Sequence, residues 1–216
     1  MARQFNSSVM NDLQGFFRKG ERKRIYLACQ NDRDKLLIAL LWKSGRRIGE
    51  VLQLKVSDID FENKDIVWNI EKKYKTLTNE NNEIIGTQKI KMMRRKPATV
   101  WLLKNLYNFI IDNQLKPQDY IFGSSHKDGP ITRQRAFQIV REASKNAGVY
   151  LVGNKLPHPH HFRHSFAIDL AKKAKSPADI RRIQMWLEHS SLDMTEQYLQ
   201  FGSEDLREML ESTGYD

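Results

Sequence analysis

Apolar residues recur along most of this chain at the three- and four-residue spacing of α-helices. The densest run, LLIALLW over residues 36–42, is predicted to be a buried helix that Asp34 caps and Gly45 ends. A basic segment over residues 11–30 is predicted to form a helix with interruptions at its glycines. The helical spacing returns in later segments: residues 48–54, 102–110, 132–147, 161–173, 177–187 and 203–210.

Strand-like sequence is confined to the region between the predicted helices at residues 48–54 and 102–110. Residues 56–71 combine β-branched and aromatic side chains around a polar turn at 62–65. The polar centre TNENNE within residues 74–86 indicates a hairpin tip or a loop. Two further short strands are expected at residues 90–93 and 98–102. The whole pattern predicts a mainly α fold with a small antiparallel β-sheet, in the α+β class.

Composition narrows the functional classes. The chain has 216 residues and a formal net charge of +10, which favours a polyanionic partner because each neutralised phosphate releases condensed counterions. A basic protein with no such partner has the same charge, but the clustering of lysines and arginines favours nucleic acid. Cys29 is the only cysteine, which excludes an internal disulfide and indicates a reducing compartment. No apolar run approaches the roughly 20 residues that span a bilayer, and no secretory signal follows Met1.

The segment SGRRIGE, residues 44–50, places two arginines at a predicted helix start. Arg46 and Arg47 follow Gly45, and an arginine there can bind two oxygens of one phosphate beside main-chain N–H groups. Glu50 lies one turn later and can hold a guanidinium in place. The alternative is a pair of surface arginines with an intrahelical salt bridge.

The segment HPHHFRH, residues 158–164, concentrates histidines beside an arginine. His160 and His164 have the spacing of a helical zinc pair, but no cysteine is near and Arg163 would repel a cation. A phosphate site uses the same residues better, with Arg163 as an electrostatic clamp and His160 as a proton shuttle. We therefore predict no metal site and no cofactor.

Near the C-terminus, QMWLEHSSLDMTEQYLQ (184–200) places Tyr198 after His189 across a polar turn. A tyrosine with apolar neighbours often packs in a core. With the other two clusters, however, it supplies a nucleophile for phosphoryl transfer. Its phenol has a reference pKa of about 10, so attack on phosphorus needs a base or a strong positive field. No pair of carboxylates suggests a two-metal nuclease.

These segments together resemble the catalytic domain of the tyrosine recombinase, or phage integrase, family. The resemblance covers SGRRIGEVLQLKVSDID, HHFRHSFA and LEHSSLDMTEQYL, in the family's order over about residues 32–201. It implies a metal- and ATP-independent enzyme that cleaves and rejoins DNA through a 3′-phosphotyrosyl intermediate. The implied catalytic residues, with Glu50 in support, are Arg47, Lys72, His160, Arg163, His189 and Tyr198. For the hairpin lysine, Lys72 is the best match, and Lys73, Lys91 and Lys96 stay open. Glu188 and Arg46 depart from the family pattern, which has glycine and an apolar residue at these positions.

The resemblance also implies an organisation and partners. We expect a basic helical segment over residues 1–31 and a catalytic domain over 32–216, with no core-binding domain before it. Double-stranded DNA is the expected partner, bound by a homotetramer, with a monomer in free solution left open, in the cytoplasm at the nucleoid. Type IB topoisomerase-like relaxation and an inactive DNA-binding relative are the alternatives. DNA-binding residues are expected to be Arg46, Lys73, Lys91, Arg94, Arg95, Lys96, Arg133 and Arg135.

Overall fold

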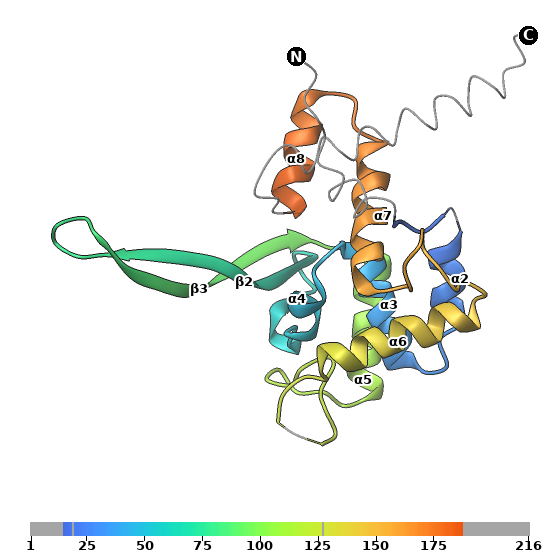
Figure 1. The fold of residues 1–216 in the computed structure, drawn as a ribbon. Coiled ribbons are helices and arrows are strands. Elements are labelled where there is room, and N and C mark those ends of the chain that lie inside the picture. The colour runs from blue at the N-terminus through green and yellow to red at the C-terminus, as the bar shows by residue number, and fades with distance from the viewer. Residues whose placement is uncertain (1–14, 19, 127, 188–216) are drawn as a thin grey trace, which may run out of the picture.

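A computed structural model describes residues 15–18, 20–126 and 128–187, without the side chains of 71–75 and 88–91. Helices surround a central helix, and one long hairpin projects from this body (Figure 1). The helices are α2 (Glu21–Leu27), α3 (Asp32–Ser44), α4 (Ile48–Leu52), α5 (Val100–Asp112), α6 (Arg133–Asn146), α7 (Pro159–Ala171) and α8 (Pro177–Leu187), with a 3₁₀ turn at Val56–Asp58. The strands are β1 (Ile59–Asp60), β2 (Asp65–Thr78) and β3 (Ile84–Pro97).

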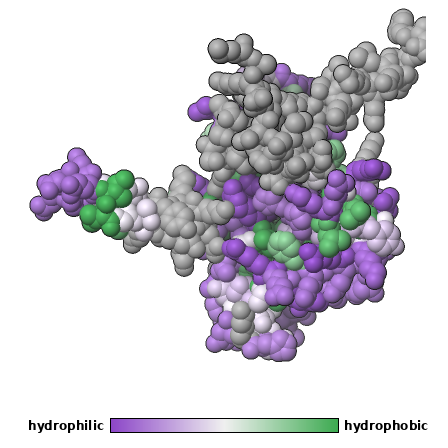
Figure 2. Space-filling model, viewed as in Figure 1, coloured by the Kyte–Doolittle hydropathy of each residue, from purple (hydrophilic) through white to green (hydrophobic). Residues whose placement is uncertain are grey.

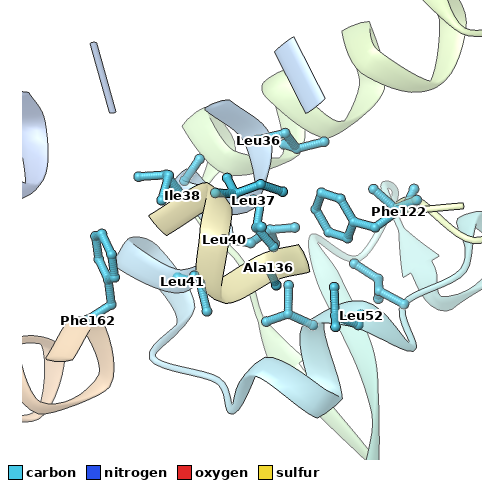
Figure 3. Packing of buried hydrophobic residues seen from close by; sticks show 14 of the residues in the cluster. Leu36, Leu37, Ile38, Leu40, Leu41, Leu52, Phe122, Ala136 and Phe162 are labelled. Carbon is cyan, nitrogen blue, oxygen red and sulfur yellow. The ribbon is translucent and has the colours of Figure 1, made fainter. Parts of the chain in front are cut away.

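Helix α3 lies at the centre because its middle, residues 36–42, is apolar on every side. Leu37, Ile38, Leu40 and Leu41 are fully enclosed, as a helix without a polar face requires. Side chains from α4, α6, α7 and the loop before α6 pack against it (Figure 3). Burying one such side chain stabilises the fold by about 1.5–3 kcal/mol. The predicted buried helix is therefore confirmed.

The cap of α3 differs from the prediction. Asn31, not Asp34, is the N-cap, and its side chain accepts a hydrogen bond of 2.9 Å from the main-chain N–H of Asp34. Asp34 is instead the third helical residue, where its negative charge favours the helix N-terminus. The helix ends at Gly45, as predicted, with φ of 62° in the left-handed region.

The antiparallel sheet has the order β1-β2-β3, and its two long strands form a hairpin. Ile66, Trp68 and Ile70 are buried near its base, whereas its distal half extends beyond the body (Figure 1). Near the polar tip, Leu77, Ile84 and Ile85 form an exposed apolar band (Figure 2). The predicted fold class is confirmed.

The strand expected over residues 98–102 was wrong. Thr99 is the N-cap of α5, and its hydroxyl accepts a hydrogen bond of 3.3 Å from the N–H of Leu102. Pro97 ends β3, so Val100 begins a helix. The β-propensity of Val100 is overridden by the cap and by the apolar face of Leu102, Leu103 and Leu106 behind it.

The described part of the N-terminal segment packs into the same body. Phe17 is buried in the main core, and its N–H donates a hydrogen bond of 2.8 Å to the hydroxyl of Ser165 in α7. Arg22 forms a salt bridge of 2.7 Å with Asp169, also in α7. The N-terminal segment thereby holds α7 through both an apolar and an ionic contact.

Helix α8 is attached less extensively. Its buried side chains, Ile183 and Leu187, form a small apolar cluster with Ala167, Ile168 and Ala171 of α7, separate from the main core. The C-terminal end of α8 lies above the base of the hairpin (Figure 1). Among the described residues, no helix has the length and apolarity that crossing a bilayer requires.

Candidate active site

The turn between α3 and α4 presents Arg47 and fixes it with Glu50. Arg47 is the N-cap of α4, and Glu50 is three residues further on. The Arg47 guanidinium lies 3.1 Å from one carboxylate oxygen of Glu50, while the Arg47 main-chain N–H donates to the other at 3.3 Å. Glu50 is buried, whereas the side chain of Arg47 keeps 27% of its surface exposed. The carboxylate therefore holds a guanidinium that still reaches solvent.

Arg46 points the other way, into the protein. It is 1% exposed, and its guanidinium lies 3.8 Å from Glu50 and donates to the main-chain oxygen of Trp186. The guanidinium of Arg46 is thus held by groups inside the protein, whereas that of Arg47 reaches solvent. The turn sends these two consecutive side chains to opposite sides, and the expected DNA-binding role of Arg46 stays a prediction.

Arg163 connects α7 with this same turn. Its guanidinium donates a hydrogen bond of 2.9 Å to the main-chain oxygen of Gly45, 118 positions earlier in the chain. It also donates to the oxygen of Leu187 at the end of α8. Arg163 is 3% exposed and lies one turn into α7. The structure thus brings the two predicted clamp segments together.

His160 lies at the exposed start of α7. His158 is the N-cap of this helix, and its imidazole accepts a hydrogen bond of 3.3 Å from the main-chain N–H of His160. The rings of His160 and His164 meet edge to face with centroids 5.0 Å apart. An exposed imidazole one turn before Arg163 can reach a substrate that approaches the N-terminus of α7.

His161 has a structural role that the sequence did not reveal. Its ring is buried. The ring centroid lies 3.7 Å from that of His158 and 6.0 Å from that of Phe17, which it meets edge to face. Burial, followed by the neighbouring histidines, lowers the pKa of His161 to about 3. Its Nδ1 accepts a hydrogen bond of 3.3 Å from the N–H of His158. Pro159, the first residue of α7, was the one sequence signal for the helix start that His158 caps.

Within the described ranges, no group of three histidine, cysteine or acidic side chains could hold a metal ion.

Other predicted catalytic residues fall outside what the structure describes. His189 and Tyr198 lie beyond Leu187, outside the described residues. Lys72, Lys73 and Lys91 are placed by their backbone only. The pairing of β2 with β3 shifts register between Ile70 and Lys73, a β-bulge opposite Lys91.

Lys96, the last open choice for the catalytic lysine, has a described side chain. Its ammonium group donates a hydrogen bond of 3.0 Å to the main-chain oxygen of Met185 in α8. Its nitrogen also lies 5.8 Å from the ring centroid of Trp186. Lys96 therefore lies beside the end of α8, close to where Arg46 and Arg163 contact the same helix.

The remaining predicted DNA-binding arginines separate into two groups. Arg133, at the start of α6, lies against α4: a Cβ added at Gly49 would meet its guanidinium at 2.6 Å. Arg135 instead interacts with Glu142 on its own helix at 3.5 Å. Arg94 and Arg95 lie exposed on β3, and Arg95 forms salt bridges with two aspartates, at 2.6 and 3.5 Å. Of Arg133 and Arg135, Arg133 is thus the one that lies against α4, the helix whose N-cap is Arg47.

Comparison with known proteins identifies the family of this chain. The model of the phage integrase family matches residues 15–204, and the chain belongs to that family. A tyrosine recombinase of Pseudothermotoga lettingae is 31% identical over 195 residues, covering 90% of this chain and 59% of that protein. The "Probable integrase/recombinase YoeC" of Bacillus subtilis is 29% identical over 174 residues, covering 81% of each chain. The chain thus spans about three fifths of the first relative.

Solved structures share the fold. The XerA recombinase matches with a TM-score of 0.66 and 24% identity, over 93% of this chain and 64% of that one. The XerH site-specific recombinase, in a post-cleavage complex with a palindromic difH substrate, matches with a TM-score of 0.67 and 23% identity, over 95% and 55% of the two chains. The expected tyrosine recombinase catalytic-domain fold is therefore confirmed.

Proposed function

We propose that this chain is the catalytic part of a site-specific DNA recombinase that cleaves and rejoins DNA through a 3′-phosphotyrosyl intermediate. The observation that carries the proposal is the bond from Arg163 to Gly45, which joins the α7 arginine to the turn that presents Arg47. Two guanidiniums from segments far apart in sequence can then neutralise one phosphate. Family membership and the DNA-bound XerH relative support DNA as the substrate.

In this proposal the phenol oxygen of Tyr198 attacks the scissile phosphorus, and the bond from phosphorus to the 5′-oxygen breaks. Arg47 and Arg163 bind the nonbridging oxygens, and His189 donates a hydrogen bond to the phosphate. His160 assists removal of the phenolic proton. Stabilising the charge of the transition state in this way is commonly the largest catalytic contribution.

The leaving 5′-oxygen needs a proton, and the hairpin lysine supplies it. Lys72 is our assignment for this donor, and its place at a β-bulge supports it because bulges redirect side chains next to active sites. Since the energy of the phosphodiester is kept in the protein link, ATP is not needed. Arg47 and Arg163 neutralise the phosphate in this proposal, so no metal ion is needed for that purpose. Rejoining reverses these steps with a 5′-hydroxyl as the nucleophile.

Arg163 must change partners when it binds the phosphate. In the structure its guanidinium donates to the neutral main-chain oxygens of Gly45 and Leu187. A phosphate oxygen carries negative charge, so a hydrogen bond to it adds an ion-pair attraction that a neutral carbonyl does not provide. Exchange of a carbonyl for the phosphate is therefore favourable.

Strand exchange between two duplexes needs four protomers, so we propose a homotetramer on DNA. Relaxation of supercoils by a topoisomerase-like monomer would use the same chemistry, but the family match favours recombination. The basic residues proposed to bind the DNA backbone, Lys73, Lys91, Arg94, Arg95, Lys96 and Arg133, are consistent with the net charge of +10.

A covalent-trapping experiment tests the proposed function. Nicked suicide duplexes, tiled across the DNA that adjoins the gene, are incubated with the protein and analysed by denaturing electrophoresis. We expect a covalent adduct with the wild type and with Tyr150→Phe, which changes an exposed tyrosine with no proposed role, but none with Tyr198→Phe. Binding without any adduct across all duplexes would instead identify an inactive DNA-binding relative.

A further inference from the structure

The last three main-chain oxygens of α8 are each bound by a basic side chain from a different element. Lys96 of β3 donates to Met185, Arg46 of the α3–α4 turn to Trp186, and Arg163 of α7 to Leu187. The final carbonyls of a helix lack intrahelical partners, and the helix dipole makes this end negative. The three cations thus form a cap, which we call the α8 cap.

Within the α8 cap, Arg46 is the most enclosed member. Its guanidinium carbon lies 5.9 Å from the ring centroid of Trp68 in β2 and 5.7 Å from that of Trp186 in α8. Glu50 lies 3.8 Å away and balances the charge. The indole N–H of Trp186 also donates a hydrogen bond of 3.2 Å to the oxygen of Ser44, next to this turn. Trp186 is therefore bound to the turn through both its main chain and its side chain.

These contacts require an arginine. A planar guanidinium can lie between two indoles while its edge donates to a carbonyl and faces a carboxylate. A lysine ammonium is a point charge that cannot do all three, and an apolar side chain leaves the Trp186 oxygen without this donor. Burying a charge costs free energy, so the cluster must have a use other than stability. One such use is to specify a single arrangement of the elements around it.

What these contacts fix is the position of the last turn of α8, where the chain leaves the helix. Only Ile183 and Leu187 of this helix are buried among the described residues, so apolar packing alone fixes it weakly. The chain continues directly from Leu187 toward His189 and Tyr198. A displacement of about 1 Å at a reacting group can lower a rate by about 100-fold.

We propose that Arg46 is a positioning residue, which holds the C-terminal end of α8 against the Arg47–Glu50 turn and so directs the chain that carries Tyr198. It acts through Trp186 and does not bind the DNA. This inference rests on the proposed function for the role of Tyr198, but the contact between Arg46 and α8 can be tested without DNA.

Hydrogen exchange on the free protein tests the contact. Arg46→Leu is compared with Arg182→Leu, which removes an exposed arginine of α8 that pairs with Asp179. We expect amides of residues 183–187 to exchange at least about ten-fold faster in Arg46→Leu, with α5 unchanged, and wild-type exchange in Arg182→Leu. Arg46→Lys should fall between Arg46→Leu and the wild type. Wild-type exchange at the end of α8 in Arg46→Leu would overturn the inference. So would equal acceleration across all helices, which would assign Arg46 to the general core.

Binding and cleavage then separate positioning from DNA contact. On a 40-bp duplex of arbitrary sequence, Arg46→Lys should keep the wild-type dissociation constant and its salt dependence. Loss of one phosphate contact would instead reduce the steepness of the plot of log binding constant against log salt concentration by about 0.9. On a suicide duplex that the wild type cleaves, the variant should cleave about 100-fold more slowly at saturating DNA. A reduced salt slope with unchanged cleavage would contradict the inference. If the wild type forms no adduct, the proposed function fails, while hydrogen exchange still decides the role of Arg46.

Discussion

Basic residues have different surroundings in the helical body and on the β2–β3 hairpin. In the body, Arg46 and Arg163 are almost fully enclosed and donate to main-chain oxygens of other elements. On the hairpin, Arg94 and Arg95 are exposed near the base, where they pair with Trp68 and Val67 of β2. The enclosed arginines have defined positions, which suits the proposed roles of Arg163 at the phosphate and of Arg46 in holding α8. The exposed ones are suited to a diffuse attraction for the DNA backbone.

The largest effect is expected where a fixed arginine meets the phosphate. Arg163→Lys should lower the rate of cleavage by about 10²–10³-fold, because lysine cannot bind two oxygens at once. DNA affinity should change little. Single-turnover cleavage and a filter-binding assay measure the two quantities, with Arg141→Lys, an exposed arginine of α6, as the control. Equal cleavage by both variants would remove Arg163 from the site.

The turn that carries Arg47 depends on Gly45. Its φ is +62°, and a Cβ there would lie 2.4 Å from the ring of Phe166 in α7. Gly45→Ala should therefore lower the free energy of unfolding by about 2–4 kcal/mol, through backbone strain and overpacking. Gly148→Ala is the matched control, with φ of +73° and nothing within 4 Å, and should cost about 1 kcal/mol. Urea denaturation that gives the same loss for both would contradict the tight contact.

The body should also lose stability in acid through His161. Its pKa is about 3 in the folded protein and about 6.5 when unfolded, so below pH 6.5 the unfolded state binds the extra proton. The contribution of His161 is fully present above pH 6.5 and is lost as pH falls toward 3, by up to about 1.4 kcal/mol per unit. His161→Gln should have a shallower pH dependence in urea titrations between pH 4 and 7. An unchanged slope would show that His161 becomes protonated without unfolding.

The smallest effect is expected on the hairpin. Arg94→Ala should reduce the steepness of the plot of log binding constant against log salt concentration by about 0.9 and weaken DNA affinity modestly. The cleavage rate at saturating DNA should not change. Arg95→Ala should change binding less, because Asp60 and Asp65 already pair with Arg95. Titrations at several salt concentrations compare the two. A slower cleavage step in Arg94→Ala would show that Arg94 takes part in catalysis. It would contradict the proposed difference between the hairpin and the body.

The sequence predicted the helical body well because helices depend on local periodicity and caps. The buried run over residues 36–42, its end at Gly45 and the contact of Glu50 with Arg47 follow from neighbours in the chain. The opposite directions of Arg46 and Arg47 do not follow from their charge, since both are equally basic. The apolar residue that the family has at the position of Arg46 was the one sequence signal for an inward direction, and the contact with Trp186 bears it out.

The N-terminus of α7 shows the same limit. HPHHFRH contains four histidines, and spacing alone does not reveal which of them faces solvent. The packing of Phe17 against His161 encloses one ring, and the start of the helix leaves His160 exposed. The helical periods and the end at Gly45 were predicted correctly, whereas the N-caps at Asn31 and Thr99 were missed and contacts between distant segments could not be predicted.

Mass spectrometry of the trapped protein–DNA adduct tests the central claim most directly. After nuclease and protease digestion, we expect one peptide with Tyr198 linked to a nucleotide 3′-phosphate. Arg163→Lys should give the same peptide in far lower yield. A nucleotide on another residue, or a 5′-phosphate link, would contradict the account.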